Sequence, residues 1–138
     1  MSQWIVDASL ALGWFLEDEQ DRQYSLSVLA GLENHDFVVP FLWHYEVANG
    51  LLMAHRRKRI TTGQVAEFLD LLKIMRVQID RTGPEAVLDL ANLGLRHDLT
   101  VYDAAYLELA LRLQLPIATQ DKALRRAMEK SGVSLVSP

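Results

Sequence analysis

The chain has 138 residues, with 14 Lys and Arg against 18 Asp and Glu, a formal net charge of -4 and no cysteine. This length predicts one domain, residues 1–138, large enough to bury a core. The missing cysteines exclude disulfides and thiolate metal sites. The apolar runs are much shorter than the ~20 residues of a membrane span, and no secretory leader is recognisable. We therefore expect a cytoplasmic protein that makes no membrane contact.

Short apolar runs alternate with segments in which apolar residues recur at helical spacing. In chain order we predict a strand at 3–7, helices at 9–15 and 21–32, a strand at 36–39, helices at 42–57 and 61–72, a strand at 76–80, helices at 82–94 and 102–113, a strand at 115–119, a helix at 122–130 and a strand at 134–136. Strands separated by helices pair in parallel through right-handed crossovers. The predicted fold class is α/β, a three-layer α/β/α sandwich with a central, mostly parallel sheet.

Polar side chains mark the start of several predicted helices, because a side-chain oxygen there can accept a backbone N–H. Pairs of Thr with Gln or Glu three residues later have the spacing of a capping box. The predicted caps are Ser9, Thr100, and the boxes Thr61 with Gln64 and Thr82 with Glu85.

Four acidic residues follow these predicted strands or open the helices after them: Asp7, Glu46, Asp103 and Asp121. Open α/β sheets bind ligands beyond the carboxyl ends of their strands, so carboxylates placed there converge. Four unpaired carboxylates would repel one another and raise some pKa values. A divalent cation such as Mg²⁺ removes this repulsion, because it prefers carboxylate oxygens. The pattern predicts metal-assisted chemistry on phosphate.

Each acid also has a structural explanation. Asp7 and Asp121 could be helix N-caps, and Asp103 lies in a first helical turn, where the helix dipole favours negative charge. Glu46 lies among apolar residues and has the weakest structural explanation, because buried glutamates are rarely unpaired. All four at strand-derived positions favour a shared site.

Basic residues cluster at 56–59 and again at Arg125 and Arg126. Without the four candidate acids, 14 acidic residues remain against 14 basic ones, so RNA would have to be held by such local clusters. Basic residues at a helix end also complement the helix dipole while staying solvated. The sequence leaves both interpretations open.

Four segments spread over nearly the whole chain resemble PIN-domain ribonucleases, specifically the VapC-type toxins of bacterial toxin–antitoxin pairs. The matching residues are Ile5-Val6-Asp7-Ala8-Ser9, Val39-Pro40 with Glu46-Val47-Ala48-Asn49-Gly50-Leu51, Leu99-Thr100-Val101-Tyr102-Asp103-Ala104-Ala105-Tyr106, and Ala118-Thr119-Gln120-Asp121-Lys122-Ala123-Leu124. The third segment is the most specific match.

This resemblance implies a Mg²⁺-dependent endoribonuclease, with Mn²⁺ also possible as the ion. By matched position, Asp7, Glu46, Asp103 and Asp121 take metal-binding and catalytic roles, and Thr119 and Ser9 supporting polar roles. Asp121 matches the least constant of the family's four acids. The resemblance further implies an RNA substrate, a cognate antitoxin protein that holds the toxin inactive, and a homodimer. The alternative is a catalytically silent PIN-like protein-binding module, whose acids hold the fold or dock a basic partner.

Overall fold

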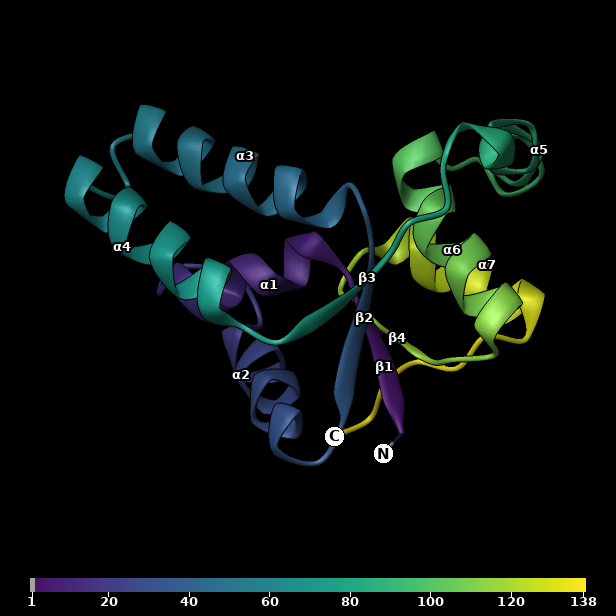
Figure 1. Ribbon diagram of the computed structural model, residues 1–138, viewed down its shortest axis with the longest axis horizontal. Helices are drawn as coiled ribbons and strands as arrows, with labels where there is room; N and C mark the ends of the chain where they lie inside the picture. Colours follow the sequence, from purple (N-terminus) through teal and green to yellow (C-terminus); the bar gives the residue numbers. More distant parts are fainter. Residues whose placement is uncertain (1) are drawn as a thin grey trace.

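The computed structural model describes residues 2–138 and contains a four-stranded parallel sheet (Figure 1). The strands are β1 (Gln3–Val6), β2 (Asp36–Pro40), β3 (Val77–Asp80) and β4 (Ile117–Ala118). They lie in the order β3-β2-β1-β4, and each neighbouring pair is parallel. The predicted parallel sheet is confirmed.

Helices cover both faces of this sheet. In Figure 1, one side carries α1 (Ala8–Phe15), α2 (Arg22–Ala30), α3 (Trp43–Arg56) and α4 (Thr62–Ile74), and the other carries α5 (Val87–His97), α6 (Val101–Leu113) and α7 (Lys122–Ser131). Two 3-10 turns, Gly31–Glu33 and Pro84–Ala86, precede β2 and α5. The three-layer α/β/α architecture is therefore confirmed. Within residues 2–138, no helix has the length and apolar character needed to cross a membrane.

The strand order reverses direction between β1 and β4. The chain first moves outward from β1 to β2 and β3 with helices on one face, and then returns past β1 to β4 with helices on the other face. In open α/β sheets, the crevice beyond the carboxyl ends of the strands at such a reversal is the usual ligand site. The topology therefore places a candidate site where β1 and β4 end.

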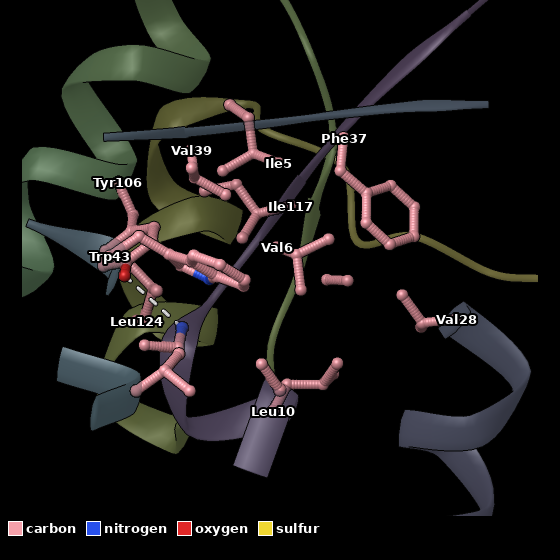
Figure 2. Close-up of a cluster of buried hydrophobic side chains, with 14 of the residues drawn as sticks. Ile5, Val6, Leu10, Val28, Phe37, Val39, Trp43, Tyr106, Ile117 and Leu124 are labelled. Carbon is pink, nitrogen blue, oxygen red and sulfur yellow. Dashed lines mark hydrogen bonds between the residues drawn. The ribbon is translucent and has the colours of Figure 1, made fainter. Parts of the chain in front are cut away.

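The core lies on both faces of β1 and β2, where β-branched and aromatic side chains are buried (Figure 2). Ile5, Phe37 and Val39 are fully buried, and so are Trp43 at the start of α3 and Tyr106 in α6. Burying side chains of this size stabilises the fold by ~1.5–3 kcal/mol each. The ends of β1 and β2 and the starts of α3 and α6 are thus fixed by packing.

Two predicted caps differ in the structure. Helix α1 begins at Ala8 and is capped by Asp7, whose carboxylate accepts the Ser9 N–H, so Ser9 is not the cap. The Thr82–Glu85 capping box is absent, because the Glu85 carboxylate accepts the N–H of Gly83 and the segment begins with a 3-10 turn. The Thr61–Gln64 box and the Thr100 cap are confirmed.

The C-terminal strands are shorter than predicted. The predicted strand at 115–119 contains only Ile117 and Ala118, and 134–136 makes a single bridge, between Ile117 and Leu135. Two backbone hydrogen bonds form this bridge, from Ile117 N to Ser134 O and from Val136 N to Ile117 O. Because β4 offers so short a partner, the last segment cannot continue as a strand.

Candidate active site

Asp7 and Thr119 lie side by side at the ends of β1 and β4. The strand register pairs Val6 with Ala118, which places the next residue of each strand at the same edge of the sheet. The Thr119 hydroxyl donates to Oδ2 of Asp7 at 2.7 Å, and the Ser9 hydroxyl donates to the same oxygen at 2.8 Å. Asp7 is only 4% exposed. Two hydroxyl donors therefore fix the orientation of a buried carboxylate.

Asp121 follows on the other side of Thr119. Its backbone N–H donates to the Thr119 hydroxyl oxygen at 3.1 Å, while its carboxylate accepts the N–H of Ala123 at 3.0 Å and caps α7. Thr119 thus connects the two aspartates, donating to one and accepting from the other. The structural explanation of Asp7 and Asp121 as N-caps is also correct, and it does not compete with a shared site.

Glu46 reaches the site from the first turn of α3, and a buried tyrosine holds it there. The Tyr106 hydroxyl donates to Oε1 of Glu46 at 2.7 Å and accepts the N–H of Ala8 at 3.3 Å (dashed line in Figure 2). Tyr106 therefore connects α6 to α3 and to the start of α1, directly after Asp7. This residue is missing from the sequence prediction, although it lies one helical turn after Asp103.

Burial and mutual repulsion raise the pKa values of three of the acids. Burial raises the pKa of Asp7, and the charge of Asp121 adds to this, while the bonds from Thr119 and Ser9 oppose it. Burial raises the pKa of Glu46 to about 7, against the Tyr106 bond and with added repulsion from Asp7 and Asp103. Burial, followed by the charges of Asp121 and Asp7, raises the pKa of Asp103 to about 6. The carboxylates are therefore close enough to resist full ionisation together.

One cleft of about 600 Å³ contains all four predicted acids. Asp7 and Asp121 cap α1 and α7, and Glu46 and Asp103 lie in the first turns of α3 and α6. Four helix N-termini thus face the cleft, and their positive dipole ends partly offset the carboxylate charge. The same dipole ends favour an approaching phosphate.

The donor chemistry of the cleft fits a hard divalent cation. Among residues 2–138, no group of three or more His, Cys, Asp or Glu side chains is arranged so that it could hold a metal ion by itself. Mg²⁺ rarely needs such a cage, because it is usually bound by one or two carboxylates together with water and substrate phosphates. Burial first, and the charges of neighbouring acids second, raise the pKa values of Asp7, Glu46 and Asp103, so a bound cation would stabilise their charged forms.

The remaining walls of the cleft come from residues that sequence reasoning did not assign to it. Asp18, Glu19 and Gln20, in the connection between α1 and α2, form one wall, and Gln120 lies between Thr119 and Asp121. The sequence indicates only a solvated acidic connection at 17–21, and nothing in it shows which element this connection faces.

A second cavity of about 660 Å³ also borders Glu46 and is lined mostly by apolar side chains. It lies among the starts of α3, α5 and α6 and does not include Asp7, Asp103 or Asp121. Large apolar side chains around it are exposed, among them Tyr45 and Tyr102. Contiguous apolar surface of this kind marks a site for another molecule, not for metal chemistry.

Residues 4–130 match the PIN domain family, so the chain belongs to that family. It is 31% identical over 121 residues to Ribonuclease VapC3 of Pyrobaculum aerophilum, covering 87% of this chain and 90% of that protein. These findings confirm the resemblance that the four sequence segments indicated.

Solved structures share the fold at low sequence identity. The chain is similar to Mycobacterium tuberculosis VapC20, described as a sarcin-ricin loop cleaving toxin, with a TM-score of 0.73 and 12% identity over 98% of this chain and 99% of that one. It is also similar to FitAcB of Neisseria gonorrhoeae, with a TM-score of 0.66 and 14% identity over 98% and 97% of the two chains.

Proposed function

We propose that this protein is a Mg²⁺-dependent endoribonuclease, a single PIN-like domain over residues 1–138, with Mn²⁺ able to replace Mg²⁺. The observation that carries the proposal is the convergence of Asp7, Glu46, Asp103 and Asp121 from four different helix starts on one cleft. Membership of the PIN domain family supports a nuclease. The printed name of the 31% identical relative, a ribonuclease, supports RNA as the substrate.

The reaction is hydrolysis of a phosphodiester bond. Water adds to phosphorus, the bond from phosphorus to one ribose oxygen breaks, and a proton lost by the water is balanced by one gained by the leaving oxygen. Asp7 and Asp103 would hold the ion, with Glu46 and Asp121 beside them. When bound, the ion stabilises charge on the phosphate and lowers the pKa of water.

Neighbouring polar groups keep these carboxylates in position. Thr119 and Ser9 donate to Asp7, and Tyr106 donates to Glu46. The Ser9 and Thr119 hydroxyls share Oδ2 of Asp7, and its Oδ1 accepts only a long bond from the Ser9 N–H at 3.4 Å. The Tyr106 hydroxyl donates to Oε1 of Glu46, so Oε2 of Glu46 and the remaining lone pairs of Asp7 Oδ1 would be left for the ion. Such outer hydrogen bonds are typically worth 10–100-fold in metal affinity or activity.

The decisive experiment compares Asp103→Asn with Asp89→Asn. Asp103 lies in the cleft, whereas Asp89 is exposed on α5 and makes no contact with the cleft. With a 5′-labelled single-stranded RNA of mixed sequence, the wild type and Asp89→Asn should cleave in Mg²⁺ and stop in EDTA. The cleavage rate of Asp103→Asn should fall about 100-fold or more, because the lost ligand charge contributes several kcal/mol to stabilising the transition state.

A catalytically silent PIN-like protein-binding module is the second candidate, and the apolar cavity beside Glu46 favours it. It predicts the same fold but no RNA cleavage in Mg²⁺ or Mn²⁺ by any of these variants. Wild-type protein that left the RNA intact in both metals would refute the nuclease and support the module.

We further propose that the protein is the toxin of a toxin–antitoxin pair, acts in the cytoplasm, is inhibited by a cognate antitoxin and forms a homodimer. The exposed large apolar side chains Leu88 and Leu95 on α5, and separately Tyr45 at the apolar cavity, support a protein partner. Leu95 is 85% exposed, so Leu95→Asp should not disturb the core. Light scattering should show a dimer for the wild type and a monomer for Leu95→Asp; a monomeric wild type would refute the homodimer.

A further inference from the structure

The connection between α1 and α2 brings two further carboxylates to the cleft. Asp18 and Glu19 line it together with the four predicted acids, and no lysine or arginine of the described chain lines it. An RNA phosphate that entered such a cleft would meet six carboxylates. At partly exposed positions this repulsion is screened by salt, with a screening length of ~8–10 Å at physiological ionic strength, so it acts mainly on a phosphate inside or next to the cleft.

Arg59, in the turn between α3 and α4, pairs with both of these wall carboxylates. Its Nε donates to Oδ2 of Asp18 at 2.9 Å, and its Nη2 donates to Oδ1 of Asp18 at 2.6 Å and to Oε1 of Glu19 at 2.9 Å. The Arg59 side chain is 26% exposed. A guanidinium that grips one carboxylate with two bonds fixes geometry as well as charge, unlike most surface ion pairs.

This pairing gives Arg59 a role that neither interpretation of the basic run at 56–59 includes, and it leaves both interpretations open for the other three residues of the run. Arg59 points to the connection and not to solvent, and its hydrogen bond holds the pKa of Asp18 below its ordinary value. The neighbouring Arg57 is exposed and makes no ion pair within residues 2–138. Arg57 and Arg59 lie two residues apart in one turn, and of the two only Arg59 pairs with the wall carboxylates, so Arg57 is a suitable control.

The far end of the connection is held separately. Nε2 of Gln120 donates to the backbone oxygen of Asp21 at 2.8 Å and to the Ser25 hydroxyl at 3.2 Å. Because this second attachment does not involve Arg59, we expect loss of Arg59 to release Asp18 and Glu19 while the end of the connection at Asp21 stays attached.

We propose that Arg59 is a positioning residue for the RNA substrate. It holds the connection at 16–21 against the cleft and pairs with both Asp18 and Glu19, offsetting one of their two negative charges, so that the phosphate backbone meets a fixed wall of lower negative charge. The inference rests on the proposed nuclease function, and it adds a distant residue that acts on substrate binding and not on the bond-breaking step.

The test compares Arg59→Ala with Arg57→Ala, using the labelled single-stranded RNA in Mg²⁺. We expect Arg59→Ala to raise KM roughly five- to tenfold and leave kcat within about twofold, the size of effect of a partly exposed charge network. Arg57→Ala should match the wild type. An unchanged KM in Arg59→Ala, a loss confined to kcat, or an equal effect of Arg57→Ala would each overturn the proposal.

Two further measurements separate this inference from the nuclease proposal. Hydrogen exchange of the peptide covering 16–21 needs no catalysis, and it should speed up in Arg59→Ala but not in Arg57→Ala. Adding Asp18→Asn and Glu19→Gln to Arg59→Ala should restore binding of the same RNA, measured by fluorescence anisotropy in EDTA, because no unpaired carboxylate remains on the wall. Unchanged exchange, or no recovery of binding, would refute the role of Arg59 even if the wild type cleaves RNA. Wild-type protein that binds but never cleaves would refute only the nuclease.

Discussion

Replacing Glu46 by glutamine should make the protein more stable at pH 8 in EDTA while removing its activity. Glutamine has nearly the same shape, and its Oε1 can still accept the hydrogen bond that the Tyr106 hydroxyl donates at 2.7 Å. What it removes is a half-buried charge that Asp7 and Asp103 repel. The variant therefore measures how much the negative charge at position 46 lowers the free energy of unfolding, while the shape and the hydrogen bond of the side chain stay the same.

The magnitude follows from the pKa of Glu46, which rises from 4.5 to about 7. A rise of this size corresponds to at most about 3 kcal/mol, and solvent screening of a half-exposed group reduces it to ~1–2 kcal/mol. Between these two pH values the folded protein holds the proton more tightly than the unfolded chain does. This contribution to stability is fully present below pH 4.5 and is lost as the pH rises through 7.

Thermal unfolding at pH 4.5 and pH 8 in EDTA measures the effect. For a domain of this size, ~1–2 kcal/mol raises Tm by roughly 3–8 °C, and the gain should appear at pH 8 and disappear near pH 4.5. Glu67→Gln, at an exposed position on α4, is the matched control and should change little at either pH. If Glu46→Gln were no more stable than the wild type at pH 8, or equally stabilised at both pH values, the argument from burial and repulsion of the Glu46 charge would be wrong.

Three other substitutions test the supports of the site by thermal or urea unfolding. Tyr106→Phe leaves a backbone N–H of α1 and the Glu46 carboxylate without their partner and should cost about 1–3 kcal/mol; calorimetric titration should also show weaker Mn²⁺ binding, and unchanged binding would contradict the role. Thr119→Val keeps the shape but removes the donor to Asp7, so we expect a loss of about 1–3 kcal/mol that Thr119→Ser largely avoids. Gly94→Ala places a Cβ 2.8 Å from a backbone carbonyl in the turn before α6 and should cost ~1–3 kcal/mol; a neutral result would show that this turn can move.

The fold and the acids could be predicted because both depend on local pattern and simple topology. Apolar runs ending at Asp7 and before Thr119 place those residues at strand ends, and parallel pairing brings the ends together. The caps at Thr61 and Thr100 depend on neighbours three residues away, and both are confirmed. The predicted cap at Thr82 is wrong because the chain enters α5 through a 3-10 turn, in which Gly83 takes the place of the cap.

What the sequence could not predict depends on contacts between distant segments. The spacing of Tyr106 along its helix is that of a core aromatic residue. Only the packing of α6 against the start of α3 brings its hydroxyl within hydrogen-bond distance of Glu46. Arg59 lies in a basic run whose members look alike in sequence, yet it alone of that run pairs with Asp18 and Glu19 in the described structure. Neither pairing has a local signal, because the partners are 60, 41 and 40 residues apart.

The position of β4 beside β1 means that the site is completed only late in the synthesis of the chain. The first acid leaves the ribosome with residue 7, but Thr119 and Asp121 follow more than a hundred residues later, and only then can β4 pair with β1. Until that moment β1 is an edge strand with unpaired backbone groups, and the Asp7 carboxylate lacks its donor from Thr119. A nascent or truncated chain that ends before β4 can build most of both helical layers and still have no complete site.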